Sequence, residues 1–176
     1  MESKNEVFKS ECAKLRKYLA PYCQGCGIEL GSGGDRIVPN AITVDLNDPY
    51  ADVGENPIQL KGDARDLYWF KDNALDFVHS AHLLEDFPNT IEIMQEWSRV
   101  LKVGGYLALN LPHEKMYREC CKNSGQTYNS NHSIEEMSSE YIIECAKSIP
   151  ELELVYETEI LYSYSFGIVF KKIARS

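Results

Sequence analysis

The residues best suited to bind a ligand lie in a glycine-rich stretch near the start of the chain. Ile28 to Leu30 is an apolar run that leads directly into Gly31-Ser32-Gly33-Gly34-Asp35. Because glycine has no Cβ, backbone N–H groups in such a turn can approach a ligand closely. A second run, Ala41 to Val44, ends at Asp45, ten residues after Asp35. A carboxylate at the end of a neighbouring strand is a common acceptor for ribose hydroxyls, so the two features together predict a nucleoside ligand.

The elements that position this stretch follow from the hydrophobic pattern. Phe8, Cys12, Leu15 and Leu19 recur with the period of a helix, which predicts an N-terminal helix within residues 1–22 that Pro21 ends. Only residues 35–40 separate the glycine turn from the second strand, so a full crossover helix barely fits there. The pattern predicts strands at 27–30, 41–45, 58–60, 74–79 and 106–111, and helices at about 64–70 and 91–101.

The sequence of the last third of the chain predicts a loop that covers the site, followed by a helix and a hairpin. Residues 113–132 are polar and, beyond a helical turn near 114–121, irregular, and we interpret them as a substrate loop and lid. Ser133 and Glu136 have the spacing of a capping box, which predicts a helix from 133 to about 147. Two β-rich runs, 152–160 and 162–172, predict an antiparallel hairpin, so that 133–174 forms a C-terminal helix and hairpin.

This order of elements defines the expected fold class. Helix, then alternating strands and helices, then a hairpin is typical of an α/β protein: a three-layer α/β/α sandwich with a mostly parallel, Rossmann-like sheet and a C-terminal antiparallel hairpin. At 176 residues the chain fits one domain, and we expect a single domain over 1–176.

Composition limits the partners and the compartment. The formal charge is −9, which disfavours nucleic acid or an anionic membrane as the main partner. The first residues lack the apolar core of a signal peptide, and no apolar run approaches the roughly 18 residues of a membrane span, so we expect a soluble, cytoplasmic protein. The oligomeric state is not predicted.

Six cysteines occur, and for a chain of this kind we expect reduced thiols. Cys23 and Cys26 have the two-residue spacing of zinc ligands, but Cys120 and Cys121 are adjacent and lack the spacer that tetrahedral sites prefer. We therefore expect small buried residues and no resident metal, with a four-cysteine zinc site as the alternative.

With the elements placed, five segments in order resemble a class I S-adenosylmethionine-dependent methyltransferase, in particular the small, type 11-like domain with an abbreviated first crossover. The resemblance covers about residues 26–112, the nucleoside-binding core, and the C-terminal hairpin agrees with it. The segments are Glu29 to Gly33, Val44-Asp45, Gly62 to Ala64, Leu75-Asp76 through Leu84-Glu85, and Arg99 to Gly105.

The resemblance implies S-adenosyl-L-methionine as the cofactor, held at the carboxyl ends of strands. It implies that Asp45 accepts from the ribose diol and that Asp63 accepts from the adenine amino group. His79 and Ser80, at the end of the fourth strand, would close over the sulfonium. The complete set of cofactor-binding residues that it implies is Glu29, Gly31, Ser32, Gly33, Asp45, Leu46, Asp63, Ala64, His79 and Ser80.

Two positions depart from the family pattern. Asp35 stands where the family has a third glycine, and an inward-pointing carboxylate there would repel the cofactor's own carboxylate. Arg36 could offset that charge. Asp86 stands where the family often has a histidine.

Methyl transfer from a sulfonium is a direct displacement, so the protein chiefly aligns the reactants and excludes water. A hydroxyl or amine acceptor also needs a base, and histidine is the commonest one. We therefore expect transfer to oxygen or nitrogen of a small molecule, with His113, His132 and His82 as candidate catalytic residues; the alternative for each is a loop or packing role.

Two other functions fit part of this pattern. One is a catalytically degenerate methyltransferase-like module that serves in binding or interaction. The other is a nicotinamide-dependent oxidoreductase, which also places an acid after its second strand but predicts a longer helix after the glycine turn.

Overall fold

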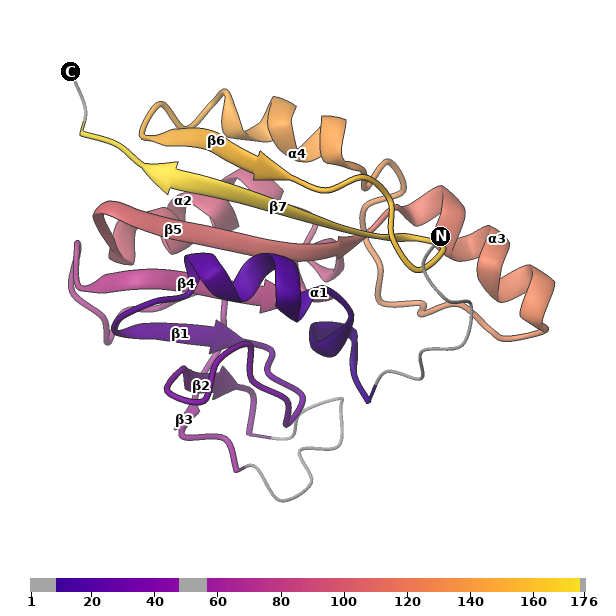
Figure 1. The fold of residues 1–176 in the computed structure, drawn as a ribbon, viewed down its shortest axis with the longest axis horizontal. Coiled ribbons are helices and arrows are strands. Elements are labelled where there is room, and N and C mark those ends of the chain that lie inside the picture. The colour runs from indigo at the N-terminus through magenta and orange to yellow at the C-terminus, as the bar shows by residue number, and fades with distance from the viewer. Residues whose placement is uncertain (1–8, 48–56, 175–176) are drawn as a thin grey trace.

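The computed structural model describes residues 9–47 and 57–174, so Phe8 of the expected first helix lies outside the described residues. Its core is a seven-stranded sheet in the order β3-β2-β1-β4-β5-β7-β6 (Figure 1). The strands are β1 (Gly27–Leu30), β2 (Ile42–Asp45), β3 (Leu60–Lys61), β4 (Leu75–Ala81), β5 (Leu101–Pro112), β6 (Leu152–Glu157) and β7 (Ser165–Lys172). The first five are parallel, whereas β7 is antiparallel to both β5 and β6. The predicted fold class is confirmed.

Helices lie on both faces of this sheet (Figure 1). Helix α1 (Glu11–Leu19) covers one face, where it packs over β5 and β7, and α2 (Thr90–Val100) and α4 (Ser139–Ala146) cover the other. Alternate strand residues therefore face different cores: Phe77 and Ala108 pack with α1, whereas Val78 and Leu107 pack with α2.

Residues 31–41, which connect β1 to β2, contain no helix, as the short spacing predicted. Ile37 and Ala41 of this connection are buried against the same core as α1. Helix α1 precedes β1 in the chain and covers the same face of the sheet, over β5 and β7.

The predicted helix at 64–70 is wrong, because residues 62–74 form turns. Side chains of α2 satisfy their backbone instead. The Trp97 indole N–H donates to the Ala64 carbonyl at 2.7 Å, and the Arg99 guanidinium donates to the carbonyls of Leu67 and Phe70. These contacts with α2 satisfy the carbonyls without helical hydrogen bonds.

Strand lengths also differ from the prediction. Strand β4 continues to Ala81, and β5 begins at Leu101, directly after α2. Where β5 pairs with β4, Leu101 lies opposite Leu75 but Tyr106 lies opposite Phe77, so the register shifts between these two pairs. Gly104-Gly105 therefore lies in an irregularity of β5 rather than at a helix end.

The predicted irregular cover at 113–132 contains a full helix, α3 (Glu114–Ser124), which ends at Gly125 in the left-handed conformation. The predicted helix start at Ser133 is also wrong, since α4 begins at Ser139. The Ser133 hydroxyl donates to the Asp86 carbonyl at 2.9 Å, and Ser138 accepts from the Tyr141 N–H and caps the helix.

Ser138→Ala should therefore destabilise the protein by about 1 kcal/mol, because the first turn of α4 loses its cap. Chemical denaturation of both proteins would measure this difference in the free energy of unfolding. Ser139→Ala is the matched control, since its hydroxyl reaches only the neighbouring Glu140 carboxylate, at 3.5 Å. Equal losses for the two variants would contradict the assigned cap.

Residues 158–164 connect β6 to β7 as a longer turn than the sequence suggested, with Tyr162 and Ser163 at positive φ. The antiparallel hairpin itself is confirmed. Within the described residues, every helix is too short or too polar to cross a membrane.

Candidate functional site

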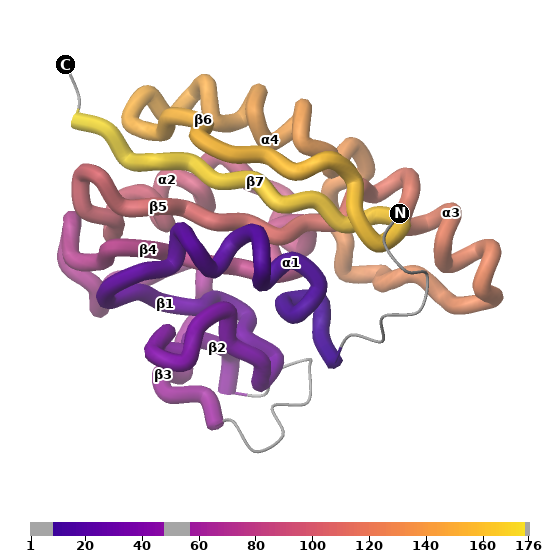
Figure 2. The backbone as a smooth tube through the Cα atoms, viewed as in Figure 1, coloured from indigo at the N-terminus to yellow at the C-terminus, as the bar shows by residue number. Residues whose placement is uncertain are grey.

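A cavity of about 880 Å³ opens at the carboxyl ends of β1, β2 and β4. This volume lies in the range of about 300–1,000 Å³ that small-molecule sites occupy. The start of α1, the first residues of α3 and the turn into β7 converge at this end of the sheet (Figure 2). The lining residues come from six segments of the chain: Lys9 to Cys12, Gly31 to Gly33, Asp45, Ala81 to Leu83 with Asp86, a set between Tyr117 and His132, and Tyr164.

The glycine turn forms one wall of this cavity. Gly31, Gly33 and Gly34 all have positive φ, a conformation that side chains rarely adopt. A Cβ on Gly31 would lie 3.0 Å from Cδ2 of Leu83, which also lines the cavity. The Ser32 hydroxyl is buried and has no hydrogen-bond partner within the described residues. The backbone of this turn can therefore approach a ligand closely, and the Ser32 hydroxyl is available to bind it. We call this turn, Gly31 to Gly34, the glycine cradle.

Asp45 lies on the same wall, at the end of β2. Its Oδ1 accepts from the Leu46 N–H at 2.8 Å, which fixes the carboxylate at the strand end. Asp63 does not line the cavity: Arg65 binds its carboxylate through two guanidinium nitrogens. These hydrogen bonds lower the pKa of Asp63, so the carboxylate is ionised and already paired. The implied adenine contacts of Asp63 and Ala64 stay predictions.

Asp35, the residue that replaces a family glycine, points away from the cavity. Its carboxylate accepts from the hydroxyl of Ser10, the N-cap of α1, and from the guanidinium of Arg16 within α1. Arg16 also donates to the Arg36 carbonyl at 2.9 Å. The expected repulsion is therefore absent, and the offsetting cation is Arg16 rather than Arg36. The same contacts join α1 to the glycine turn.

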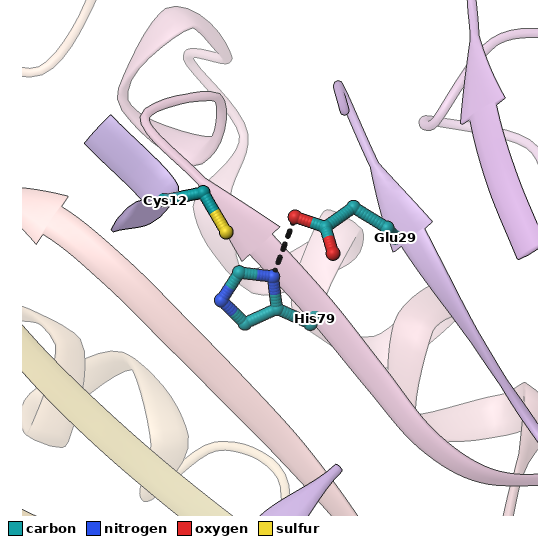
Figure 3. A group of neighbouring side chains, drawn as sticks. All are labelled: Cys12, Glu29 and His79. Atoms are coloured by element: carbon teal, nitrogen blue, oxygen red, sulfur yellow. Dashed lines mark hydrogen bonds and ion pairs between the residues drawn. The ribbon is translucent and has the colours of Figure 1, made fainter. Parts of the chain in front are cut away.

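Glu29 and His79 belong to a buried network on the α1 face, together with Cys12 (Figure 3). One ligand-type atom of each lies within 4.8 Å of the others, and this is the single such group of His, Cys, Asp or Glu in the described ranges. The Glu29 carboxylate accepts from the His79 ring at 2.9 Å and from the Ile37 N–H at 2.6 Å. Burial raises the pKa of the Cys12 thiol, which stays neutral.

Glu29, His79 and Ser80, all implied as cofactor contacts, do not line the cavity. His79 points to the α1 face and Ser80 to the opposite core, and neither lines the cavity because β4 continues past them to Ala81. Glu29 holds the connection after the glycine turn through Ile37. The cysteines of the alternative zinc site are all free and do not form a group within the described residues.

His132 and Glu114 form a hydrogen-bonded pair on the far wall of the cavity. The His132 Nδ1 lies 2.7 Å from Oε2 of Glu114, whose side chain is 1% exposed. Arg118 binds the other carboxylate oxygen at 2.6 Å. A carboxylate at Nδ1 holds the proton there and leaves Nε2 as the basic nitrogen, so this pair has the arrangement of an oriented general base.

His82 also lines the cavity, in a left-handed backbone conformation (φ 51°). Its Nε2 lies 3.2 Å from Oε2 of Glu11, and its Nδ1 lies 3.5 Å from Oε1 of Glu85. Burial lowers the pKa of His82 to about 4, so its ring is neutral at pH 7.

His113 does not line the cavity. Its backbone N–H donates to the Tyr164 carbonyl at 2.7 Å, and its ring interacts with Glu140 of α4. The structure thus brings His82 and His132 to the cavity and directs His113 elsewhere.

The sequence did not indicate Glu11, Glu85 or Tyr164 as neighbours of the site. Tyr164 donates to Glu11 at 3.1 Å across 153 positions of sequence, and no local pattern signals such a contact. Glu114 is found at the site because it is the first residue of α3, which the sequence suggested only as one helical turn.

Comparisons with known proteins agree with this geometry. Residues 25–109 match the family model described as "Methyltransferase domain". No curated protein matches the chain. A methyltransferase structure from Archaeoglobus fulgidus, described as SAM dependent, superposes with a TM-score of 0.70 at 16% identity, covering 92% of each chain. One from Thermotoga maritima, described as a possible histamine N-methyltransferase, has a TM-score of 0.69 at 21% identity and covers 93% of this chain and 88% of that one.

The sheet order and the match of residues 25–109 to a methyltransferase domain support a class I S-adenosylmethionine-dependent methyltransferase. S-adenosyl-L-methionine is the cofactor of this family, and the cradle and Asp45 fit it. The fold alone does not define the reaction, since the [4+2]-cyclase SpnF also superposes with a TM-score of 0.65 at 13% identity, covering 92% of this chain and 81% of that one.

Proposed function

We propose that the protein transfers the methyl group of S-adenosyl-L-methionine to oxygen or nitrogen of a small molecule. The observation that carries this proposal is one cavity with a backbone cradle on one wall and the His132–Glu114 pair on another. A methyl donor and an acceptor bound in the same cavity would meet without any covalent enzyme intermediate.

Gly31, Ser32, Gly33 and Asp45 would hold the cofactor, because they combine a backbone turn open to close approach, an unsatisfied hydroxyl and a strand-end carboxylate. When bound, the cofactor supplies an electrophilic methyl group. We assign Leu46 no direct contact, since its side chain does not line the cavity.

His132 would take the proton of the acceptor on Nε2, and the Glu114 carboxylate would stabilise the imidazolium that forms. Tyr117 and Tyr164 line the cavity near this base, with ring centroids 5.2 Å apart. Their rings exclude water from the acceptor and restrict its orientation.

Calorimetry with S-adenosyl-L-methionine and S-adenosylhomocysteine tests the cofactor site. We expect both to bind, and we expect release of S-adenosylhomocysteine when a panel of small hydroxyl and amine compounds is added. Binding without release for any compound would favour the alternative, a non-catalytic binding module. No binding of either nucleoside would overturn the proposal.

The oxidoreductase alternative has less support, because no helix follows the glycine turn in residues 31–41. An increase of NADH fluorescence on mixing with the protein would support the oxidoreductase alternative. A small-molecule acceptor in the cytoplasm remains our proposal for the partner and compartment, in keeping with the charge of −9.

A further inference from the structure

Five side chains form a closed ring of contacts at the acceptor end of the cavity. Oε1 of Glu85 lies 3.5 Å from Nδ1 of His82 and 3.8 Å from Nε2 of His132. The His82 ring packs against Tyr164, with centroids 6.0 Å apart, and Tyr164 packs against Tyr117. The Tyr117 ring lies 4.9 Å from that of His132, which closes the ring. All except Glu85 line the cavity directly.

Glu85 is the unusual member of this group. Its side chain is 0% exposed, and neither carboxyl oxygen has a hydrogen-bond partner within the described residues. Burial, together with the charges of Asp86, Glu114 and Glu11, raises its pKa well above the usual range. A buried carboxyl without a hydrogen-bond partner is costly, and Glu85 contacts two residues that line the cavity, so a cation bound there would stabilise it.

Carboxylates outnumber cationic side chains among the residues that line the cavity. Asp86 lines the cavity, and its Oδ1 is buried without a hydrogen-bond partner. Glu11 also lines it and is paired with Lys14 outside the cavity lining. Lys9 is the one lysine or arginine among the described lining residues. An anionic acceptor would face these carboxylates, whereas a cation would satisfy them.

Tyr164 contacts the ammonium group of a lysine side chain in this structure. The Lys14 ammonium lies 4.3 Å from the centroid of its ring and donates to its hydroxyl at 2.8 Å. Aromatic faces next to carboxylates are the usual environment for an organic ammonium group.

On the basis of the proposed methyl transfer, we infer that the acceptor is an amine, which binds as its ammonium ion against the Asp86 carboxylate and the rings of Tyr117 and Tyr164. The buried Glu85 carboxyl, which contacts His82 and His132 without lining the cavity, adds its charge to this site. His132 takes one proton from the ammonium, which frees the nitrogen lone pair. That lone pair forms the new N–C bond while the S–C bond breaks. The electron pair of the S–C bond stays on sulfur. The products are the N-methylammonium ion, neutral S-adenosylhomocysteine and protonated His132.

Binding to the complex with S-adenosylhomocysteine tests this inference separately from turnover. The probes are 2-phenylethylamine, 2-phenylethanol and phenylacetate, which differ only in the terminal group. We expect calorimetry to show the amine binding at least tenfold more tightly than the other two. Because Glu85 ionises when a cation pairs with it, the measured heat should also depend on the ionisation enthalpy of the buffer.

Glu85→Gln keeps the shape of the side chain and removes its charge. It should raise the dissociation constant of 2-phenylethylamine at least tenfold, abolish the buffer dependence of the heat that arises from Glu85, and leave the affinity for S-adenosylhomocysteine within about twofold. Glu92→Gln, at an exposed position of α2, is the matched control and should change neither affinity.

The outcomes separate the two proposals. Equal binding of the three probes, or amine binding that Glu85→Gln leaves unchanged, overturns the amine inference whatever the turnover. A weaker affinity for S-adenosylhomocysteine in Glu85→Gln, with amine affinity unchanged, would assign the carboxylate to the cofactor and also overturn it. Selective amine binding with no methyl transfer to any amine contradicts the proposed function but leaves the ammonium site in place.

Discussion

His132→Ala should lower the turnover number for methyl transfer by roughly two to four orders of magnitude, the usual contribution of a positioned base. The variant removes the nitrogen that accepts the proton and leaves Glu114 buried beside Arg118. Because His132 is not among the residues that would hold the cofactor, affinity for S-adenosyl-L-methionine should change little. Release of S-adenosylhomocysteine under single-turnover conditions would measure the effect on the chemical step.

His113→Ala is the control for this experiment, since His113 does not line the cavity and its ring faces Glu140. We expect it to retain turnover. A loss as large as that of His132→Ala would show that the base is His113. Glu114→Gln should give a smaller loss than His132→Ala and shift the pH profile, because the imidazolium loses its counter-charge.

Asp45→Ala should weaken binding of S-adenosyl-L-methionine by about 1–3 kcal/mol, or roughly 5- to 150-fold, through loss of a charged hydrogen-bond acceptor. The Asp45 carboxylate is held at the end of β2 by the Leu46 N–H and faces the cavity. Calorimetric titration of the variant would give the dissociation constant. Asp45→Asn keeps the acceptor oxygen and should lose less.

Unchanged affinity in Asp45→Ala would place the ribose elsewhere. Asp63→Ala is the informative companion, because Arg65 occupies the Asp63 carboxylate in this structure. Little change is expected from the geometry. A comparable loss would instead confirm the adenine contact that the family resemblance implies.

The sequence was a good guide where a feature depends on local chemistry. Gly31 and Gly33 lie in the left-handed conformation that only glycine tolerates easily, and Asp45 ends its strand as the pattern predicts. The mostly parallel sheet and the terminal hairpin are likewise visible as periodicity and spacing.

The sequence was a poor guide where distant segments decide the structure. The helix predicted at 64–70 is replaced by turns because Trp97 and Arg99 of α2 bind its carbonyls. Ser133 has the spacing of a cap, but the carbonyl of Asp86 binds its hydroxyl instead. The ring of contacts around Glu85 could not be predicted, because its members lie far apart in the sequence. They come from the end of β4 and the short helix η2 (Leu84–Asp86), from α3, from the segment before α4 and from the turn into β7.

The position of α1 has a consequence for biosynthesis. This helix supplies Ser10, Glu11 and Cys12 to the cavity, yet it packs against β7, and Lys14 contacts Tyr164 across 150 positions of sequence. During translation α1 leaves the ribosome long before the strand that holds it. A nascent chain that stops short of β7 therefore lacks Tyr164 and one of the two strands on which α1 packs, so we expect its cavity to be incomplete.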